Sequence, residues 1–199
     1  MATKEKLILA GLDLFHRHGV HPVGLDRIIQ HAGVTKTTFY NYFESKEDLV
    51  CAVIDRFGAE VHSRIQLRID RTQSVQSTES IKKHMLNVFS AWDQLFEHQA
   101  FRGCMLIGAG VSSGDIHDPA RQAAIRNKQA LLRTYEDLAA EAGFKNPQQF
   151  ATRFGLLVDG SLIARHLYSV RNEAEQAHQM AEQLIDAAIV EAAKGESAD

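Results

Sequence analysis

Proline and cysteine are scarce in this chain, and it has no long apolar run. Only three prolines, Pro22, Pro119 and Pro147, occur in 199 residues, and the stretches between them are rich in Ala, Leu, Gln and Glu. This composition favours helices over strands. No segment approaches the ~18 consecutive apolar residues that a membrane-spanning helix needs. The first residues also lack the small-residue cleavage site of a signal peptide, so we expect an all-α, cytoplasmic protein without a membrane partner.

The two cysteines, Cys51 and Cys104, lie far apart and form no CxxC pair. Two cysteines cannot build a disulfide framework, which favours a reducing compartment. The ten histidines match no zinc-binding spacing. No group of residues resembles a catalytic constellation in the sequence. We therefore expect a protein with no catalytic residues, no metal and no cofactor.

The charge distribution is uneven along the chain. The net charge of −3 argues against a protein that coats nucleic acid by bulk attraction, but not against one that concentrates positive charge locally. Residues 1–43 hold five basic and three acidic side chains, which leaves +2 there and −5 on the remainder. The N-terminal segment is thus the more basic part.

Apolar periodicity, capping residues and glycines divide the chain into nine predicted helices. They span about 3–18, 25–31, 36–42, 46–69 and 81–98, a short irregular helix within 101–117, then 119–142, 147–170 and 172–193. Thr35 and Ser45 are expected to cap the third and fourth helices, and Asp118 and Asn146 each precede a proline that suits a first helical position. Residues 70–80 are predicted to form a loop, and 194–199 to fray.

The second and third predicted helices, joined by Ala32-Gly33-Val34, form a helix-turn-helix. The third helix would enter the major groove of DNA with its N-terminal residues at the base edges. Its outward face offers Lys36, Thr37, Thr38 and Asn41 to bases, while Tyr40, Tyr42 and Lys46 suit phosphate oxygens. Phe39 and Phe43 are expected in the core. Tyr40 has a second interpretation, as a tyrosine that packs between helices.

The run GVTKTTFYNYFESKEDL at 33–49 closely resembles the signature AGVSKGTLYxHFxSKExL of the TetR family of transcriptional regulators. The resemblance implies an all-α, nine-helix dimer, with a helix-turn-helix DNA-binding domain at 1–47 and a ligand-binding and dimerisation domain at 48–199. Besides the base and phosphate contacts given above, the resemblance implies that Arg27 contacts the DNA backbone. The expected DNA-binding residues are Arg27, Thr35, Lys36, Thr37, Thr38, Tyr40, Asn41, Tyr42 and Lys46.

Three positions depart from the family pattern. Thr37 stands where glycine is frequent, so the recognition helix presents a side chain there. Tyr42 replaces a common histidine and keeps a hydrogen-bonding aromatic ring. Gly24 replaces the usual Ser or Thr cap of the second helix, so this chain lacks the hydroxyl that often contacts a phosphate there.

The C-terminal part resembles the family more loosely, through Arg102-Gly103-Cys104 and the stretch 156–160. The expected pocket residues are Phe57, Val61, His84, Phe89, Trp92, Phe96, Phe101, Cys104, Met105, Leu131, Tyr135 and Asp159. Each apolar one is equally well explained as plain core. Trp92 is the favoured contact because an indole combines a large apolar area with one N–H donor. Asp159 fits either a polar pocket position or the dimer contact.

The dimer is expected to form through the eighth and ninth helices as a four-helix bundle. Two apolar stripes are predicted to make it: Phe150, Phe154, Leu157, Gly160, Ile163 and Ala164 on one helix, and Met180, Leu184 and Ile185 on the other. Two helix-turn-helix units spaced by ~34–36 Å can read a palindrome on one face of a duplex. A ligand need only bind better to a conformer with the wrong spacing.

The sequence therefore predicts a repressor that a small apolar or amphipathic effector releases from a palindromic operator in double-stranded DNA. One alternative keeps the DNA binding but makes Cys104 a redox sensor, because Arg102 nearby would lower its pKa. Another is a helical enzyme or binding protein with a vestigial DNA-binding domain.

Overall fold

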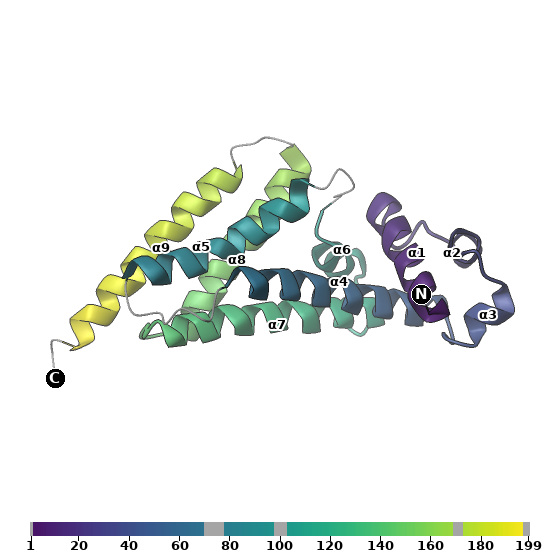
Figure 1. Cartoon of the computed structure of the whole chain (residues 1–199), viewed down its shortest axis with the longest axis horizontal. Helices are drawn as coiled ribbons and strands as arrows, with labels where there is room; N and C mark the ends of the chain where they lie inside the picture. Colours follow the sequence, from purple (N-terminus) through teal and green to yellow (C-terminus); the bar gives the residue numbers. More distant parts are fainter. Residues whose placement is uncertain (1, 70–77, 98–102, 169–172, 197–199) are drawn as a thin grey trace. The chain divides into compact units, whose positions relative to one another are not determined.

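The structure, a computed structural model, describes residues 2–69, 78–97, 103–168 and 173–196, with the side chains at 78–79, 93–97, 173–174 and 195–196 left out. These ranges fold into nine helices and no strand, which confirms the predicted all-α class (Figure 1). The helices are α1 Thr3–His18, α2 Leu25–Ala32, α3 Lys36–Tyr40, α4 Lys46–Arg68, α5 Thr78–Glu97, α6 Met105–Ser112, α7 Pro119–Glu141, α8 Pro147–Tyr168 and α9 Glu173–Glu196. None of the described helices is long and apolar enough to cross a bilayer.

Side-chain caps begin four of the helices at the predicted places. Backbone N–H groups donate to Thr35 Oγ1 at 3.1 Å, Ser45 Oγ at 3.1 Å, Asp118 Oδ1 at 2.9 Å and Asn146 Oδ1 at 3.1 Å. Each bond satisfies an N–H that has no partner within its own helix. These helix starts therefore follow from chemistry within a few residues of the cap.

A left-handed glycine closes α2 and makes the turn into α3. Gly33 has φ 65° and ψ 38°, and its N–H donates to the carbonyl of Gln30. Only glycine adopts this conformation without steric cost, so the turn depends on residue 33. Gly19 ends α1 with a positive φ of 79°, but its ψ of 165° lies outside the left-handed helical region.

The prediction was wrong for one boundary each of α3, α5 and α9, while the other helix ends agree within two residues. The helix α3 ends at Tyr40 rather than 42, because the chain must turn before Ser45 caps α4 and Phe43 must reach the core, where it is 5% exposed. The helix α5 begins at Thr78, inside the predicted loop. The prediction missed this start because the first turn of α5 is polar and carries no apolar periodicity. The helix α9 continues to Glu196, where fraying was predicted, although Gly195 has a low helix propensity.

The described chain divides into two compact units, each considered by itself. Unit 1 comprises Met1–Val61 and Ala100–Lys128, and unit 2 comprises His62–Gln99 and Gln129–Asp199. In unit 1, α1 packs on α2, and the fully buried Leu7, Ile28 and Phe39 belong to its core. The functional boundary between 47 and 48 stays a prediction.

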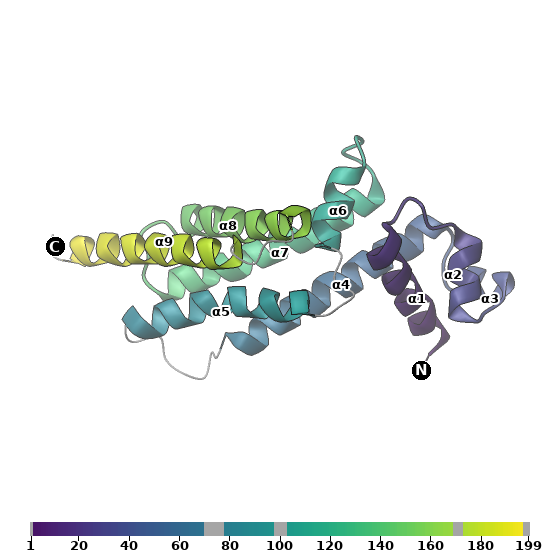
Figure 2. The same cartoon turned by 90° about the horizontal axis from the view of Figure 1, so that it is seen from above.

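Unit 2 is built around rings on α5, α7 and α8. Phe154 lies edge-on to Phe89 at 5.5 Å and to Tyr135 at 5.2 Å, and it stacks on Phe150 at 5.7 Å between ring centroids. Figure 2 shows α9 running beside α8, and α9 also packs on α5. Aromatic pairs of this geometry add to the stabilisation that burial itself provides.

Candidate functional site

The core of the helix-turn-helix holds α3 by its apolar side. Phe39 is fully buried and Phe43 nearly so, with ring centroids 5.7 Å apart, as predicted for these two residues. Lys4 from α1 lies over the Phe43 ring at 5.6 Å. Because Phe39 is anchored, the other side of α3 is turned to solvent.

The solvent face of α3 and the turn after it carries the predicted DNA-binding side chains. Lys36, Thr37, Tyr40, Asn41 and Tyr42 are exposed. Tyr40 and Tyr42 are 51% and 44% exposed, which is high for aromatic residues in a folded domain. Tyr40 also lies edge-on to Phe39 at 5.3 Å, so its ring packs locally while half of the side chain stays accessible.

The hydroxyls of Thr35 and Thr38 are engaged with each other. Thr35 Oγ1 accepts from the Thr38 N–H and lies 2.8 Å from Thr38 Oγ1. Both hydroxyls thus serve the start of α3. The predicted DNA contacts of these two hydroxyls stay a prediction, and each hydroxyl would have to contact DNA while it takes part in this bond.

Two basic residues of the predicted set make local contacts. Lys46 Nζ donates to the Val20 carbonyl at 3.3 Å, which ties the start of α4 to the loop between α1 and α2. The Arg27 guanidinium donates to Nε2 of His18 at 2.8 Å. Neither contact was visible in the sequence, because each joins residues on different elements.

The Asp13 side chain on α1 contacts one residue of its own helix and one residue of α2. Its carboxylate accepts from Arg17 at 2.8 Å and lies 3.0 Å from Nε2 of His31. All three side chains are at least about a third exposed, so this network orients α1 against α2 more than it stabilises the fold.

Farther along α1, His16 packs edge-on against Phe57 at 5.2 Å. Burial lowers the pKa of His16, although the charges of Glu60 and Asp13 oppose that shift. Its Nε2 is buried and has no partner among the described residues. The neutral imidazole is therefore the form that this position favours.

The predicted pocket residues fall into two sets. Phe57, Val61, Cys104 and Met105 are buried in unit 1, and His84, Phe89, Trp92, Leu131 and Tyr135 are buried in unit 2. Asp159, also in unit 2, is half-buried. Phe101 and the side chain of Phe96 lie outside the described residues. Within unit 2, Phe89 and Tyr135 meet the same ring, Phe154.

The predicted dimer residues divide between the interior and the surface of unit 2. Phe150, Phe154 and Ile185 are at most 5% exposed, so their apolar area is already covered within one chain. Gly160, Ile163 and Met180 are exposed, and Leu157, Ala164 and Leu184 are half-buried. The face available to a partner is therefore narrower than the two predicted stripes.

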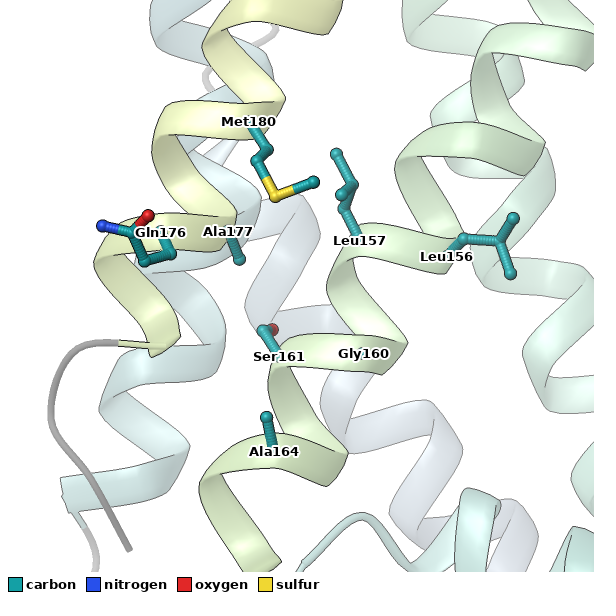
Figure 3. Close-up of a pocket in the computed structure, with 8 residues that line it drawn as sticks. All are labelled: Leu156, Leu157, Gly160, Ser161, Ala164, Gln176, Ala177 and Met180. Carbon is teal, nitrogen blue, oxygen red and sulfur yellow. The ribbon is translucent and has the colours of Figure 1, made fainter. Parts of the chain in front are cut away.

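An apolar groove lies along this exposed face between α8 and α9 (Figure 3). Its volume is about 490 Å³, and it is lined by Leu156, Leu157, Gly160, Ser161, Ala164, Gln176, Ala177 and Met180. In the close-up, Leu157 and Met180 point toward one another across the groove. The prediction missed Leu156, which is 68% exposed, although the spacing 156, 160, 164 continues one helical stripe.

The two cysteines occupy different environments in unit 1. Burial raises the pKa of the Cys51 thiol, and the carboxylate of Asp55 raises it further. Cys104 is the N-cap residue of α6 and is 7% exposed. Arg102, which was expected to activate it, lies outside the described residues. Across the described ranges, no three His, Cys, Asp or Glu side chains gather as metal ligands would.

Residues 7–53 match the family model of bacterial regulatory proteins of the tetR family. The chain is 26% identical over 132 residues to the HTH-type transcriptional repressor NemR of Escherichia coli, a stretch that covers 65% of this chain and 63% of NemR. It is also 26% identical over 170 residues to the transcriptional regulator AcuR of Cereibacter sphaeroides, covering 82% of this chain and 76% of AcuR.

Solved structures share the fold over nearly the whole chain. A TetR-family transcriptional regulator from Streptomyces coelicolor superposes with a TM-score of 0.84 at 22% identity, covering 94% of this chain and 96% of that one. The reduced form of E. coli NemR gives a TM-score of 0.78 at 19% identity, covering 92% and 97%. At these identities the two solved structures support the fold alone. The similarity to the tetR family rests on the family model and on the two relatives.

Proposed function

We propose that the chain is a homodimeric, DNA-binding repressor of the TetR family that a small effector releases from a palindromic operator. The helix-turn-helix carries this proposal. Buried Phe39 anchors α3, and Lys36 and Tyr40 on the opposite side face outward. Cations, hydroxyls and methyl groups on such a face are the groups that read a major groove and hold its phosphates.

The groove between α8 and α9 supports the homodimer. Leu156 and Met180 are 68% and 53% exposed on this face, and Ile163 is 43% exposed. A contiguous apolar patch of this kind marks an interaction surface. A second copy is the occupant we propose, because a two-fold contact would pair α8 and α9 with their equivalents and set two recognition helices on one duplex.

Binding of operator DNA and the mass of the protein in solution test the proposal together. We expect a gel shift with DNA upstream of the protein's own gene that weakens steeply as salt is raised, and a mass of two chains by light scattering. Met180→Glu should give single chains and abolish the shift. Val111→Glu is the control, because Val111 on α6 is 77% exposed and receives the same charge outside the groove. Absence of any specific shift would overturn the proposal.

The thiol sensor remains a second candidate because of the place of Cys104. The N-terminus of α6 favours a thiolate, and NemR, which this chain resembles, is described in a reduced form. Its 7% exposure favours plain packing instead. If diamide releases the Cys104→Ser variant from DNA as readily as the natural protein, the thiol is not the sensor.

A further inference from the structure

Two buried polar atoms on α5 lack hydrogen-bond partners among the described residues. They are Nδ1 of His84 and Nε1 of Trp92, on side chains that are 4% and 2% exposed in unit 2. A polar atom that loses water without gaining a partner is costly, and native proteins contain few of them. The two atoms therefore need an explanation beyond packing.

Other buried polar side chains of unit 2 find their partners inside the chain. Thr134, 3% exposed, lies 3.0 Å from Nε2 of His62 through its hydroxyl. Ser161, 9% exposed, donates to the Val158 carbonyl at 2.7 Å. This unit thus satisfies hydroxyls that serve its packing, while both exceptions lie on α5.

The two exceptions share one stripe of the helix. His84, Val88 and Trp92 follow each other at i, i+4 and i+8, and Val88 is fully buried between them. Eight residues of α-helix place the two ends about 12 Å apart along the axis. Phe89, beside this stripe, lies against Phe154 at 5.5 Å, so the neighbourhood is apolar and aromatic.

We infer that His84 and Trp92 bind the two ends of an elongated, amphipathic effector with an apolar middle. The indole N–H can only donate, so the effector presents an acceptor such as a hydroxyl, carbonyl or carboxylate oxygen to Trp92. Nδ1 of His84 donates or accepts according to its tautomer, and a hydroxyl satisfies either form. The inference rests on the proposed function and names the class of ligand that this regulator would bind. Because both ends of the ligand must be polar, a pure hydrocarbon is excluded.

Matched probe pairs test this ligand class directly. Trp92 is the only tryptophan, so its fluorescence reports binding at this site. The probes are biphenyl-4,4′-diol against 4-phenylphenol, and 1,8-octanediol against 1-octanol. We expect the diol to bind roughly tenfold more tightly than its mono-alcohol in at least one pair. If only the burial of apolar area mattered, the mono-alcohol would bind more tightly than the diol. Tighter binding of the mono-alcohol in both pairs would therefore overturn the inference.

Variants separate ligand binding from a structural role. His84→Leu and Trp92→Phe remove the polar atom and keep an apolar side chain, so both should erase the preference for the diol, read by thermal shift. The ligand-free Tm of His84→Leu should not fall, because Nδ1 of His84 has no bond to lose among the described residues. Thr134→Val is the control and should lower the Tm while the preference for the diol survives. If the preference also survives in His84→Leu, that imidazole is not a ligand contact.

Gel shifts on the same preparations distinguish this inference from the proposed function. Operator binding without preference for either diol overturns the inference and leaves the repressor intact. Preference for a diol without operator binding overturns the repressor and leaves the ligand site.

Discussion

Asn127 on α7 occupies the space that a side chain at position 58 of α4 would need. A Cβ added to Gly58 would lie 1.9 Å from Oδ1 and 2.9 Å from Cβ of Asn127. The Asn127 amide in turn donates to Asp55 at 2.7 Å and to the Ala123 carbonyl at 2.9 Å. Within unit 1, Gly58 therefore permits a close helix contact that a polar bridge then holds.

Gly58→Ala should destabilise the protein by about 1–3 kcal/mol, because Asn127 must move and give up its bridge. Gly108→Ala on α6 is the matched control, since a Cβ there meets no atom within 4 Å. Alanine at this exposed helical position should leave the stability unchanged or raise it by up to ~1 kcal/mol. Urea unfolding measures both variants, and equal stabilities would contradict the close contact.

Lys46→Ala should weaken operator binding on all sequences and reduce the slope of affinity against salt by about one phosphate contact. Thr37→Ala, on the exposed face of α3, should instead change the preference at particular bases. Because Lys46 also holds the Val20 carbonyl at 3.3 Å, Lys46→Arg serves as the control that keeps a cation. Gel shifts over an operator library check the assignment. An even loss for Thr37→Ala on every operator would contradict a base contact.

Protonation of His16 should destabilise the folded protein as the pH is lowered. Burial lowers the pKa of its imidazole below the ordinary 6.5, while Glu60 and Asp13 oppose the shift. The unfolded chain therefore takes up a proton near pH 6.5 and the folded chain only at lower pH, so stability declines as pH drops below that value. His16→Leu should show a smaller fall in Tm between about pH 7.5 and 5.5. An equal fall in both proteins would assign the pH dependence to other groups.

Cys51 should react slowly with iodoacetamide at neutral pH. Burial and the Asp55 carboxylate raise the pKa of its thiol, and the opposing charge of Arg126 is the smaller influence. The thiolate is the nucleophile, so a raised pKa lowers the reactive fraction. The Cys104→Ser variant isolates this thiol for labelling. A rate above that of glutathione would contradict the assignment.

The helix starts and the helix-turn-helix could be predicted because their determinants lie within a few residues. Thr35, Ser45, Asp118 and Asn146 cap helices through bonds to N–H groups three residues on. Gly33 makes its turn through its own backbone conformation. The start of α5 at Thr78 escaped prediction, because a polar first turn looks like a loop when apolar spacing is the signal.

The sequence by itself determined the all-helical class and which side of α3 is buried, since capping and periodicity are local properties. Only the tertiary structure decided which apolar residues of α8 and α9 face inward. Phe154 and Met180 fit the predicted stripes equally well, yet Phe154 is 1% exposed and Met180 53%. Tertiary packing also left Nδ1 of His84 without a partner among the described residues, whereas the Thr134 hydroxyl has one in His62. Burial and hydrogen-bond partners depend on helices far apart in the chain, and no local pattern encodes which of them meet.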